Sequence, residues 1–536
     1  LDIDFLSQLP RVVERTGWLG QFHLVGQWFP KIGVLELPGE RGATAPRWNV
    51  HEFHLNSEFY ADYGSYDVRI TAPADYLIGA VGELVGTPES AAGKRSWRFH
   101  QDDVHDFAFV AAKDLVEMTA RWRGEGGSEV AIRVLHPAEY AAAARRALVS
   151  TEAALEYFSR TLGPYPYRTV TVVLPPWNAE AAGGMEYPTF FTASSVLDPV
   201  PGSLDELEAD FTTIHEFGHG YFYGILGSNE FEEPMLDEGL NEFWDVRMLA
   251  GSRREVEFVP PWLRRFGIGP RMDGFTLSRL AASLRDSPDP LGANAWDRLS
   301  GRSYGSVYSR TAVVLHDLEA ELGSEAFGRA MQAYYRQWKF RHPSIADLRA
   351  ALATATGKPE VVDRLFDGYV FGTAEIDDRV AYIRTRELLP TPGLAEADGK
   401  PAEPDPAVRA EQIEAARAAW RRQHPDAAPG TGPYPWYSTV ILRRDGLALP
   451  QTVRVRFVDG SQEDVAWTAT GRWTRLEFTR PSAVLSAEID PDRRRLLDID
   501  KLNDSRSREP DGAASRRWSA DAAALLQGVF GVLGGL

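Results

Sequence analysis

The sequence predicts a multidomain α+β protein with an antiparallel β-domain at its N-terminus, a helical middle and a β-sandwich near its C-terminus. Three observations lead to this fold class. The length of 536 residues suits three or four domains of ordinary size. Short alternating or β-branched runs dominate residues 1–136 and return after Tyr437. Between residues 204 and 366, apolar residues recur instead at the spacing of three and four that one buried helical face requires.

The first predicted domain, residues 1–136, is a β-domain. Its last strand signal is the β-branched run Val130–Leu135, which ends before His136-Pro137. The period then changes, and the Ala-rich segment Ala138–Leu162 is expected to form a helix that ends at Gly163-Pro164. This change from a strand pattern to a helical pattern of apolar residues predicts a domain boundary near residue 136.

The second predicted domain, residues 137–375, is mainly helical. A buried strand is expected at Val170–Leu174, before the helical patterns begin. The segment Leu204–Tyr221 keeps a single apolar face, which predicts an amphipathic helix. Val307–Leu322 is a second strong helix, and Gly323 stands where a helix C-cap is expected.

The third predicted domain, residues 376–500, is a small antiparallel β-sandwich. Its strand signals are separated by turn dipeptides such as Asp445-Gly446 and Asp459-Gly460. Residues 391–432 are rich in Pro, Gly and Ala, which predicts a linker or solvated insertion within this domain. Residues 501–536 are expected to form a C-terminal tail.

Charge and composition exclude several classes of function. Lys plus Arg number 58 and Asp plus Glu number 76, so the net charge is 58 − 76 = −18. Such an acidic chain is not expected to bind nucleic acid, because phosphate contacts need basic patches. The chain has no cysteine, which excludes disulfides, thiolate metal ligands and a cysteine nucleophile.

Membrane association is expected at most at the C-terminal end. No run of about 20 uninterrupted apolar residues occurs, so no membrane span is predicted. The nearest candidate, Ala520–Leu536, is expected to be a terminal helix, and the alternative is a peripheral contact with a membrane surface. We expect the chain to be soluble as given, in the cytoplasm or outside it. Neither the compartment nor the oligomeric state follows from the sequence.

The segment His215-Glu216-Phe217-Gly218-His219 predicts a zinc site. Two histidines four residues apart lie on one face of a helix, so both imidazoles can reach the same ion. Glu216 is rotated from that face by one residue, which places a carboxylate beside the open coordination position. Because a zinc-bound water has a lowered pKa, Glu216 is expected to accept its proton as general base.

A third protein ligand is expected on a neighbouring helix, because catalytic zinc usually has three protein ligands and a water. The next predicted helix begins near Leu236, and Glu238 lies 238 − 219 = 19 positions after His219. Glu238 is therefore the expected ligand, with Glu242 as the alternative one turn later. The acids of the intervening turn are expected to be solvated or capping carboxylates; they are Glu230, Glu232 and Glu233.

With these residues the chain resembles the gluzincin aminopeptidases, the group of alanyl aminopeptidase and leukotriene-A hydrolase. In that family H-E-x-x-H is followed, after eighteen residues, by the glutamate ligand. A second family signature, G-x-M-E-N, is similar to Gly183-Gly184-Met185-Glu186-Tyr187, which departs from it at Tyr187. The resemblance implies that Glu186 binds the free α-amine of the substrate, and that the backbone beside it lies along the peptide.

A third feature of the family is a tyrosine about 70 residues after the last ligand, which donates a hydrogen bond to the oxyanion. Tyr308 opens a segment that resembles the family's Tyr-x-Lys-Gly, with Arg310 and Thr311 in place of Lys and Gly. Tyr304, one turn earlier, is the alternative donor.

The resemblance covers about residues 66–371 and implies a thermolysin-like catalytic domain. The first domain is shorter than usual for the family, so we expect it to be incomplete. The implied activity is that of a zinc-dependent aminopeptidase, with one Zn²⁺ per chain and peptides with a free N-terminus as substrates. The alternatives are a zinc endopeptidase and a catalytically silent binding or scaffold protein on the same fold.

Overall fold

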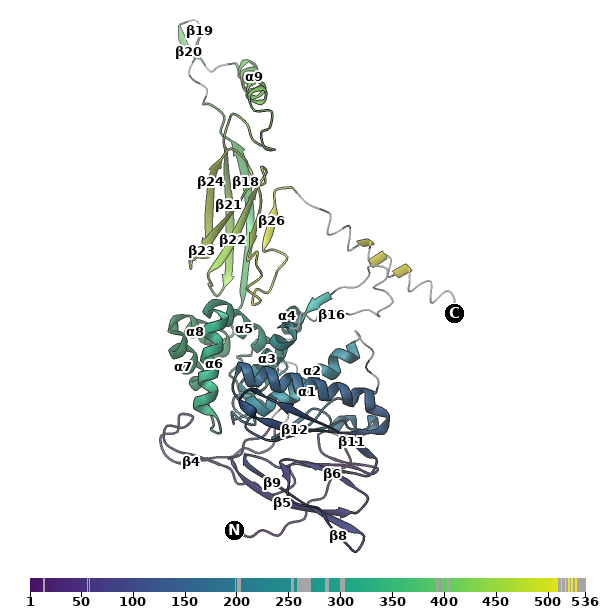
Figure 1. Ribbon diagram of the computed structural model, residues 1–536. Coiled ribbons are helices and arrows are strands. Elements are labelled where there is room, and N and C mark those ends of the chain that lie inside the picture. Colours follow the sequence, from purple (N-terminus) through teal and green to yellow (C-terminus); the bar gives the residue numbers. More distant parts are fainter. Residues whose placement is uncertain are drawn as a thin grey trace. The chain divides into compact units, whose positions relative to one another are not determined.

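The structure is a computed structural model that divides into two compact units, Leu1–Thr373 and Ala374–Leu536 (Figure 1). The finer domain boundaries expected at residues 136, 375 and 500 stay predictions. The structure describes residues 1–536 except 13–14, 55, 57, 198, 200–203, 252–254, 258–270, 285–288, 299–303, 392, 394, 398, 403–404, 510–511, 513–515, 517–518, 521, 524–525 and 528–536.

The first part of the Leu1–Thr373 unit consists of antiparallel strands, as predicted. One sheet has the order β1-β2-β10-β6, and another pairs β5 with β9, so that Ile70 lies opposite Trp97. Strands β7 and β8 also pair with β9, and β3 pairs with β4. The bounds are β1 Gly17–Leu19, β2 Phe22–Val25, β3 Val34–Glu36, β4 Arg47–Asn49, β5 Gly64–Pro73, β6 Leu77–Ala80, β7 Glu83–Leu84, β8 Glu89–Ala91, β9 Lys94–Val104 and β10 Phe109–Ala112.

A mixed sheet of order β11-β12-β13-β15-β14 follows in the chain. Strands β12, β13 and β15 run parallel, whereas β11 and β14 pair antiparallel with their neighbours. Every residue of β13 is buried, as expected of a β-branched run in the middle of a sheet. Strand β14 lies at the edge of this sheet. The bounds are β11 Leu115–Arg123, β12 Glu129–Pro137, β13 Thr169–Val173, β14 Met185–Tyr187 and β15 Phe190–Thr192.

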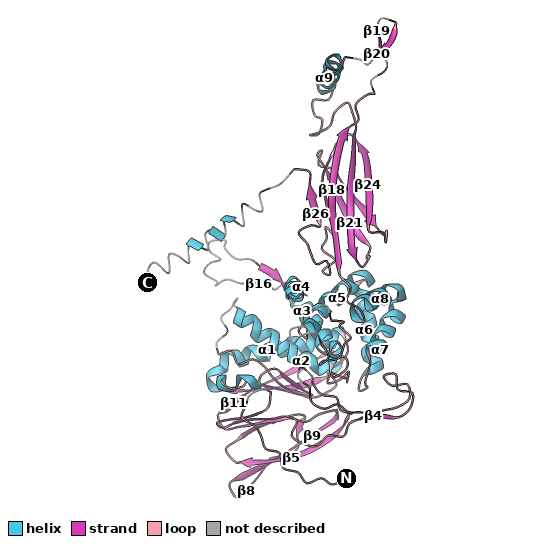
Figure 2. Cartoon of the chain, turned by 180° about the vertical axis from the view of Figure 1, so that it is seen from behind, coloured by secondary structure: helices cyan, strands magenta, loops and turns pink. Residues whose placement is uncertain are grey.

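The helices of this unit gather on one side of its strands (Figure 2). Helix α1 packs against β12 and α2 through an Ala-rich face that includes Ala147, Ala154 and Phe158. Gly323 ends α5 with a φ of 90°, which confirms the expected stop. The bounds are α1 Ala141–Thr161, α2 Leu204–Phe222, α3 Glu238–Gly251, α4 Gly274–Leu284, α5 Ser306–Leu322, α6 Ser324–Trp338, α7 Ile345–Thr356 and α8 Pro359–Leu365, with a short hairpin of β16 Glu255–Glu257 and β17 Arg271–Asp273.

Two glycines allow α2, α3 and α5 to approach one another closely. A Cβ on Gly239 of α3 would lie 2.6 Å from the Cβ of Thr311 on α5. A Cβ on Gly218 of α2 would lie 1.9 Å from Oδ1 of Asn241 on α3. Both positions therefore require the absence of a side chain, and they bring together the helices that carry the predicted zinc ligands.

The Ala374–Leu536 unit contains two antiparallel sheets, β18-β21-β24 and β23-β22-β25-β26. Their shared core includes Val440, Val455 and Phe457, in agreement with the expected sandwich. The second sheet continues to β26, past residue 500; the sequence did not predict this strand, because its three polar residues lack an alternating pattern. The bounds are β18 Ile376–Glu387, β21 Trp436–Gly446, β22 Gln451–Phe457, β23 Gln462–Trp467, β24 Trp473–Arg480, β25 Val484–Ile489 and β26 Ser505–Ser507.

The segment predicted as a linker or insertion, residues 391–432, contains the strands β19 Ala395–Ala397 and β20 Lys400–Ala402 and the helix α9 Pro406–Gln423. Helix α9 buries none of its residues, which agrees with a solvated insertion. Within the described part of the chain, no helix has both the length and the apolar character that a bilayer span needs. Most of residues 520–536 lies outside the described residues, so the peripheral membrane contact stays a prediction.

Candidate metal centre and active site

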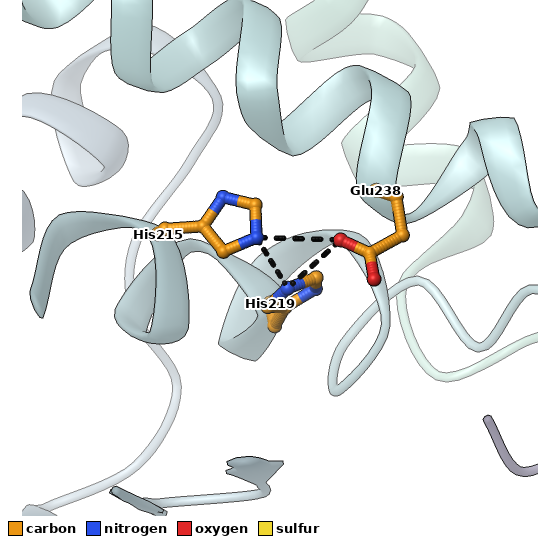
Figure 3. Close-up of side chains that lie close together, drawn as sticks. All are labelled: His215, His219 and Glu238. Carbon is orange, nitrogen blue, oxygen red and sulfur yellow. Dashed lines mark hydrogen bonds and ion pairs between the residues drawn. The ribbon is translucent and has the colours of Figure 1, made fainter. Parts of the chain in front are cut away.

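His215 and His219 lie on the same face of α2, and their Nε2 atoms are 3.1 Å apart (Figure 3). The four-residue spacing produces this arrangement, since residues i and i+4 of a helix are neighbours. His219 is buried and His215 is partly buried. Two imidazole nitrogens are thus directed at one point.

Glu238, the first residue of α3, supplies a third donor at that point. Its Oε2 lies 3.3 Å from Nε2 of His215 and 3.3 Å from Nε2 of His219. The Glu238 side chain is 5% exposed, and Oε2 has no hydrogen-bond partner among the described residues. A tetrahedral ion with ligand distances of about 2.0–2.1 Å has ligands separated by about 3.3–3.4 Å. The three residues therefore fit a zinc ion.

Each histidine is oriented by a buried aspartate behind it. Nδ1 of His215 lies 2.8 Å from Oδ2 of Asp245, and Nδ1 of His219 lies 2.5 Å from Oδ1 of Asp237. When Nδ1–H donates a hydrogen bond to the carboxylate, Nε2 keeps the lone pair that a metal needs. These aspartates have no signal in the sequence, because an acid behind a histidine is recognised only once the helices are packed.

Glu242, the alternative ligand, belongs to a different group of side chains. It lies with Asp245 around His215, and this group contains a single histidine. The group of His215, His219 and Glu238 contains both. The donor set of two imidazoles and one carboxylate is typical of catalytic zinc, so the group with Glu238 fits zinc better than the group with Glu242.

Glu216 is buried beside these ligands, on the next residue of α2. Its Oε2 has no hydrogen-bond partner among the described residues. Burial raises the pKa of Glu216 to about 8, and positive charge on His215 opposes that shift. A Cβ on Gly184 would lie 3.7 Å from Oε1 of Glu216, so the segment before β14 passes close to this carboxylate.

Glu186 lies on β14, where two glycines shape the approach to the strand. Gly184 has a φ of +70°, and a Cβ on Gly183 would lie 2.9 Å from the carbonyl oxygen of Ala193. Met185 and Glu186 are both buried. Burial raises the pKa of the Glu186 carboxyl, and the positive charges of His219 and then of a further residue, Arg15, oppose the shift.

Tyr308 and Tyr304 both lie at the centre, near the start of α5. The hydroxyl of Tyr308 donates a hydrogen bond to Oε1 of Glu238, and its ring lies 6.0 Å from the ring of His215. The ring of Tyr304 lies 5.9 Å from that of Tyr308, and its buried hydroxyl has no partner among the described residues. Both candidate donors of the sequence analysis are therefore present.

Glu233 fits the expected capping role, because its Oε1 accepts a 3.0 Å hydrogen bond from the backbone N–H of Ile345 at the start of α7. Glu230 and Glu232 are not simply solvated, which corrects the sequence-based expectation for them. Glu230 is fully buried. Glu232 and Glu233 form ion pairs of 2.8 and 2.5 Å with the guanidinium of Arg41, from the N-terminal part of the unit. This pairing has no signal in the sequence, because Arg41 lies about 190 residues earlier in the chain.

Comparisons with known proteins show which families this part of the chain is similar to. Residues 146–369 match the model of the peptidase family M1 domain. Aminopeptidase M1-A of Oryza sativa subsp. japonica is 27% identical over 147 residues, which cover 27% of this chain and 16% of the relative. Tricorn protease-interacting factor F2 of Thermoplasma volcanium is 21% identical over 220 residues, which cover 40% of this chain and 27% of the relative.

A solved structure shares the fold. The crystal structure of Legionella pneumophila aminopeptidase A in complex with aspartic acid superposes with a TM-score of 0.57 and 15% identity, covering 82% of this chain and 45% of that chain. The matched regions thus span less than half the length of each of these relatives. The matched domain contains the two histidines, Glu186, Glu216, Glu238 and both tyrosines. Residues 146–369 therefore match a peptidase family M1 domain, which supports the resemblance of this part of the chain to the gluzincin aminopeptidases.

Proposed function

We propose that the chain is a zinc-dependent aminopeptidase, which removes the N-terminal residue of peptides and holds one Zn²⁺ between His215, His219 and Glu238. One observation supports the proposal above all others. The three donor atoms lie 3.1–3.3 Å apart, within a domain that also buries an unpartnered glutamate beside them. When bound, zinc would lower the pKa of a water and polarise the scissile carbonyl.

Glu216 is proposed as general base. Its carboxylate would accept the proton of the attacking water and later deliver it to the leaving amine. The unpartnered Oε2 supports this role, because an oxygen that no protein donor occupies is open to a water.

Glu186 is proposed to bind the α-amine of the substrate. A carboxylate suits an ammonium group because charge-assisted hydrogen bonds are the strong ones. The position of β14 at the edge of its sheet supports the accompanying role of the Gly183–Met185 backbone. The backbone of a substrate peptide can pair with the outer side of an edge strand. Such pairing with β14 would bring the N-terminal amine of the peptide to Glu186.

Tyr308 is proposed to donate a hydrogen bond to the oxyanion. Its hydroxyl already reaches Oε1 of Glu238, which supports a position next to the reacting carbonyl. Tyr304 remains the alternative donor. Substitution of each tyrosine by phenylalanine distinguishes the two candidate donors.

The test of the proposed function combines zinc content with hydrolysis of leucine 4-nitroanilide. We expect a chelator to abolish turnover and added Zn²⁺ to restore it. Glu216→Gln should retain zinc and lower kcat by about 10²–10⁴-fold. Glu208→Gln, an exposed position on the same helix, is the matched control and should change neither.

Two outcomes would contradict the proposal. Hydrolysis of N-acetylated peptides as fast as of free peptides would indicate an endopeptidase and would exclude an amine-binding role for Glu186. A zinc-loaded chain that hydrolyses neither kind of substrate would indicate a binding or scaffold protein.

A further inference from the structure

We propose that Arg15 selects peptides whose N-terminal residue carries a side-chain carboxylate. This inference rests on the proposed aminopeptidase function and names its substrate class. It concerns a residue that lies outside the matched domain and carries no motif in the sequence.

The segment that contains Arg15 lies beside the approach to β14. The backbone N–H of Arg15 donates a 2.6 Å hydrogen bond to the carbonyl oxygen of Ala181, five residues before Glu186. Strand β1, which begins two residues after Arg15, also packs against residues Trp177–Ala182. The start of the chain is therefore held against the segment that carries the proposed amine site.

A buried glutamate holds the Arg15 guanidinium in place. Nη1 of Arg15 donates to Oε1 of Glu58, whose side chain is 2% exposed, whereas the side chain of Arg15 is 38% exposed. A guanidinium has five N–H donors, and Glu58 uses one nitrogen. Among the described residues, the structure shows no other side-chain partner of the guanidinium, which solvent reaches, and its remaining donors suit a carboxylate of the substrate.

The guanidinium lies within electrostatic range of the candidate catalytic groups. Burial lowers the pKa of Arg15, whereas the negative charges of Glu186 and, to a smaller extent, Glu238 raise it. The charges outweigh burial, so the pKa is raised overall. The effect is mutual, because Arg15 opposes the rise in the pKa of Glu186 and of Tyr304. The geometric evidence is the backbone hydrogen bond to Ala181, which holds Arg15 beside the segment that carries Glu186, and these electrostatic effects agree with that position.

This placement favours the side chain of the N-terminal residue as the source of the carboxylate. The side chain branches from the same Cα as the amine that Glu186 would bind, so the two groups lie close together. The C-terminal carboxylate of a dipeptide is at most about 7 Å further along the chain, because each residue spans about 3.3–3.6 Å. That carboxylate would lie beyond the scissile bond, away from Glu186.

The test compares anilides of glutamate, glutamine and leucine, because glutamine matches glutamate in shape but has no charge. The zinc-loaded chain should hydrolyse the glutamate anilide with a kcat/KM at least about tenfold above that of the glutamine anilide. Arg15→Gln should lower the ratio of kcat/KM for glutamate to kcat/KM for leucine by about ten- to a hundredfold, as expected for one lost charge-assisted hydrogen bond. Arg15→Lys should restore part of the loss, since it keeps the charge but not the planar fork.

Two further variants separate recognition from folding. Arg15→Gln leaves Glu58 buried without its partner, so the double variant Arg15→Gln with Glu58→Gln removes both charges and should show the same loss for glutamate. Arg69→Gln, on an exposed arginine of β5, is the control and should leave the preference unchanged. Equal losses for all three anilides would show that Arg15 is structural and would overturn the proposal, as would a loss confined to dipeptides with a free C-terminus.

A binding measurement keeps this inference distinct from the proposed function. L-glutamate and L-glutamine are titrated into the zinc-loaded chain by calorimetry, without any turnover. Tighter binding of L-glutamate that is lost in Arg15→Gln would support the inference even if no anilide is hydrolysed. Equal affinity of the two amino acids for the unsubstituted chain would overturn it, whatever the activity.

Discussion

Tyr308 donates a hydrogen bond to Oε1 of Glu238, the carboxylate oxygen that does not face the two histidines. One residue of α5 thereby holds the carboxylate that α3 contributes to the centre. Oε2 is left free for the ion, and the hydroxyl group stays next to the position where a scissile carbonyl would lie. Under the proposed mechanism, we expect Tyr308 to have two separable effects, one on zinc affinity and one on turnover.

Tyr308→Phe is expected to lower kcat by about 10²–10³-fold, the loss typical of one oxyanion donor. Zinc affinity should fall by at most about 10–100-fold, because the variant also removes a hydrogen bond to a ligand. Turnover is measured at saturating Zn²⁺, so that the two effects are separated. Tyr304→Phe should lower kcat less than tenfold; a larger loss there than in Tyr308→Phe would assign the donor to Tyr304.

Asp245→Asn is expected to weaken zinc binding by about 10–100-fold, because the amide no longer enforces the required proton position on His215. The dissociation constant is measured by competition with a chromophoric chelator. Asp205→Asn, at an exposed position in the first turn of α2, is the control and should leave the constant unchanged. Equal zinc affinity in Asp245→Asn and the control would show that the aspartate does not support the ligand.

Gly239→Ala is expected to destabilise the first unit by about 1–3 kcal/mol, since the new methyl group would overlap the side chain of Thr311 on α5. Gly328→Ala makes the same change in α6, where nothing lies within 4 Å of the new Cβ. It should stabilise the helix by up to about 1 kcal/mol. Opposite shifts of the melting temperature in the two variants would support the close approach of α3 and α5, whereas shifts of the same sign would contradict it.

The second unit is expected to lose stability as the pH rises from about 4 to about 7. Burial, together with the negative charge of Asp504, raises the pKa of Asp498 from 3.8 to about 7. In that interval the folded state holds a proton that the unfolded state has released, so the free energy of unfolding decreases with increasing pH. Three pKa units correspond to about 4 kcal/mol.

Asp498→Asn should abolish most of this dependence, because the amide does not ionise. The measurement is the urea midpoint of the second unit at pH 5 and pH 8. At each urea concentration, a hydrogen-exchange pulse of fixed pH labels the unfolded fraction. The deuterium uptake of peptides from β22 then gives the midpoint of the second unit. An equally large fall in midpoint in the Asn variant would show that another group carries the proton.

The parts of the candidate site that depend on local spacing could be predicted from the sequence. His215, Glu216 and His219 lie within five residues of one helix, so helical geometry alone determines their relative positions. Glu238 followed from the expected ligand number and a short connection between two helices. The helical middle and the sandwich were predictable for the same reason, since the spacing of apolar residues along the sequence indicates helices and strands.

The parts that depend on tertiary packing could not be predicted. Asp245 becomes a partner of His215 only when α3 lies against α2, which in turn requires Gly218 to accommodate Asn241. Arg15 lies 171 residues before Glu186, and its segment carries no signal for the contact. The same holds for Arg41, whose pairing with Glu232 connects the N-terminal strands to the turn before α3.

The edge position of β14 has a consequence for how widely such an enzyme could act. Main-chain N–H and C=O groups are the same for nearly every amino acid, so pairing through them discriminates little between the residues that follow the first one. Discrimination would then be concentrated at the leading residue, and the remainder of a peptide would be tolerated almost regardless of its composition. A library with a constant first residue and randomised later positions should consequently be trimmed at nearly uniform rates.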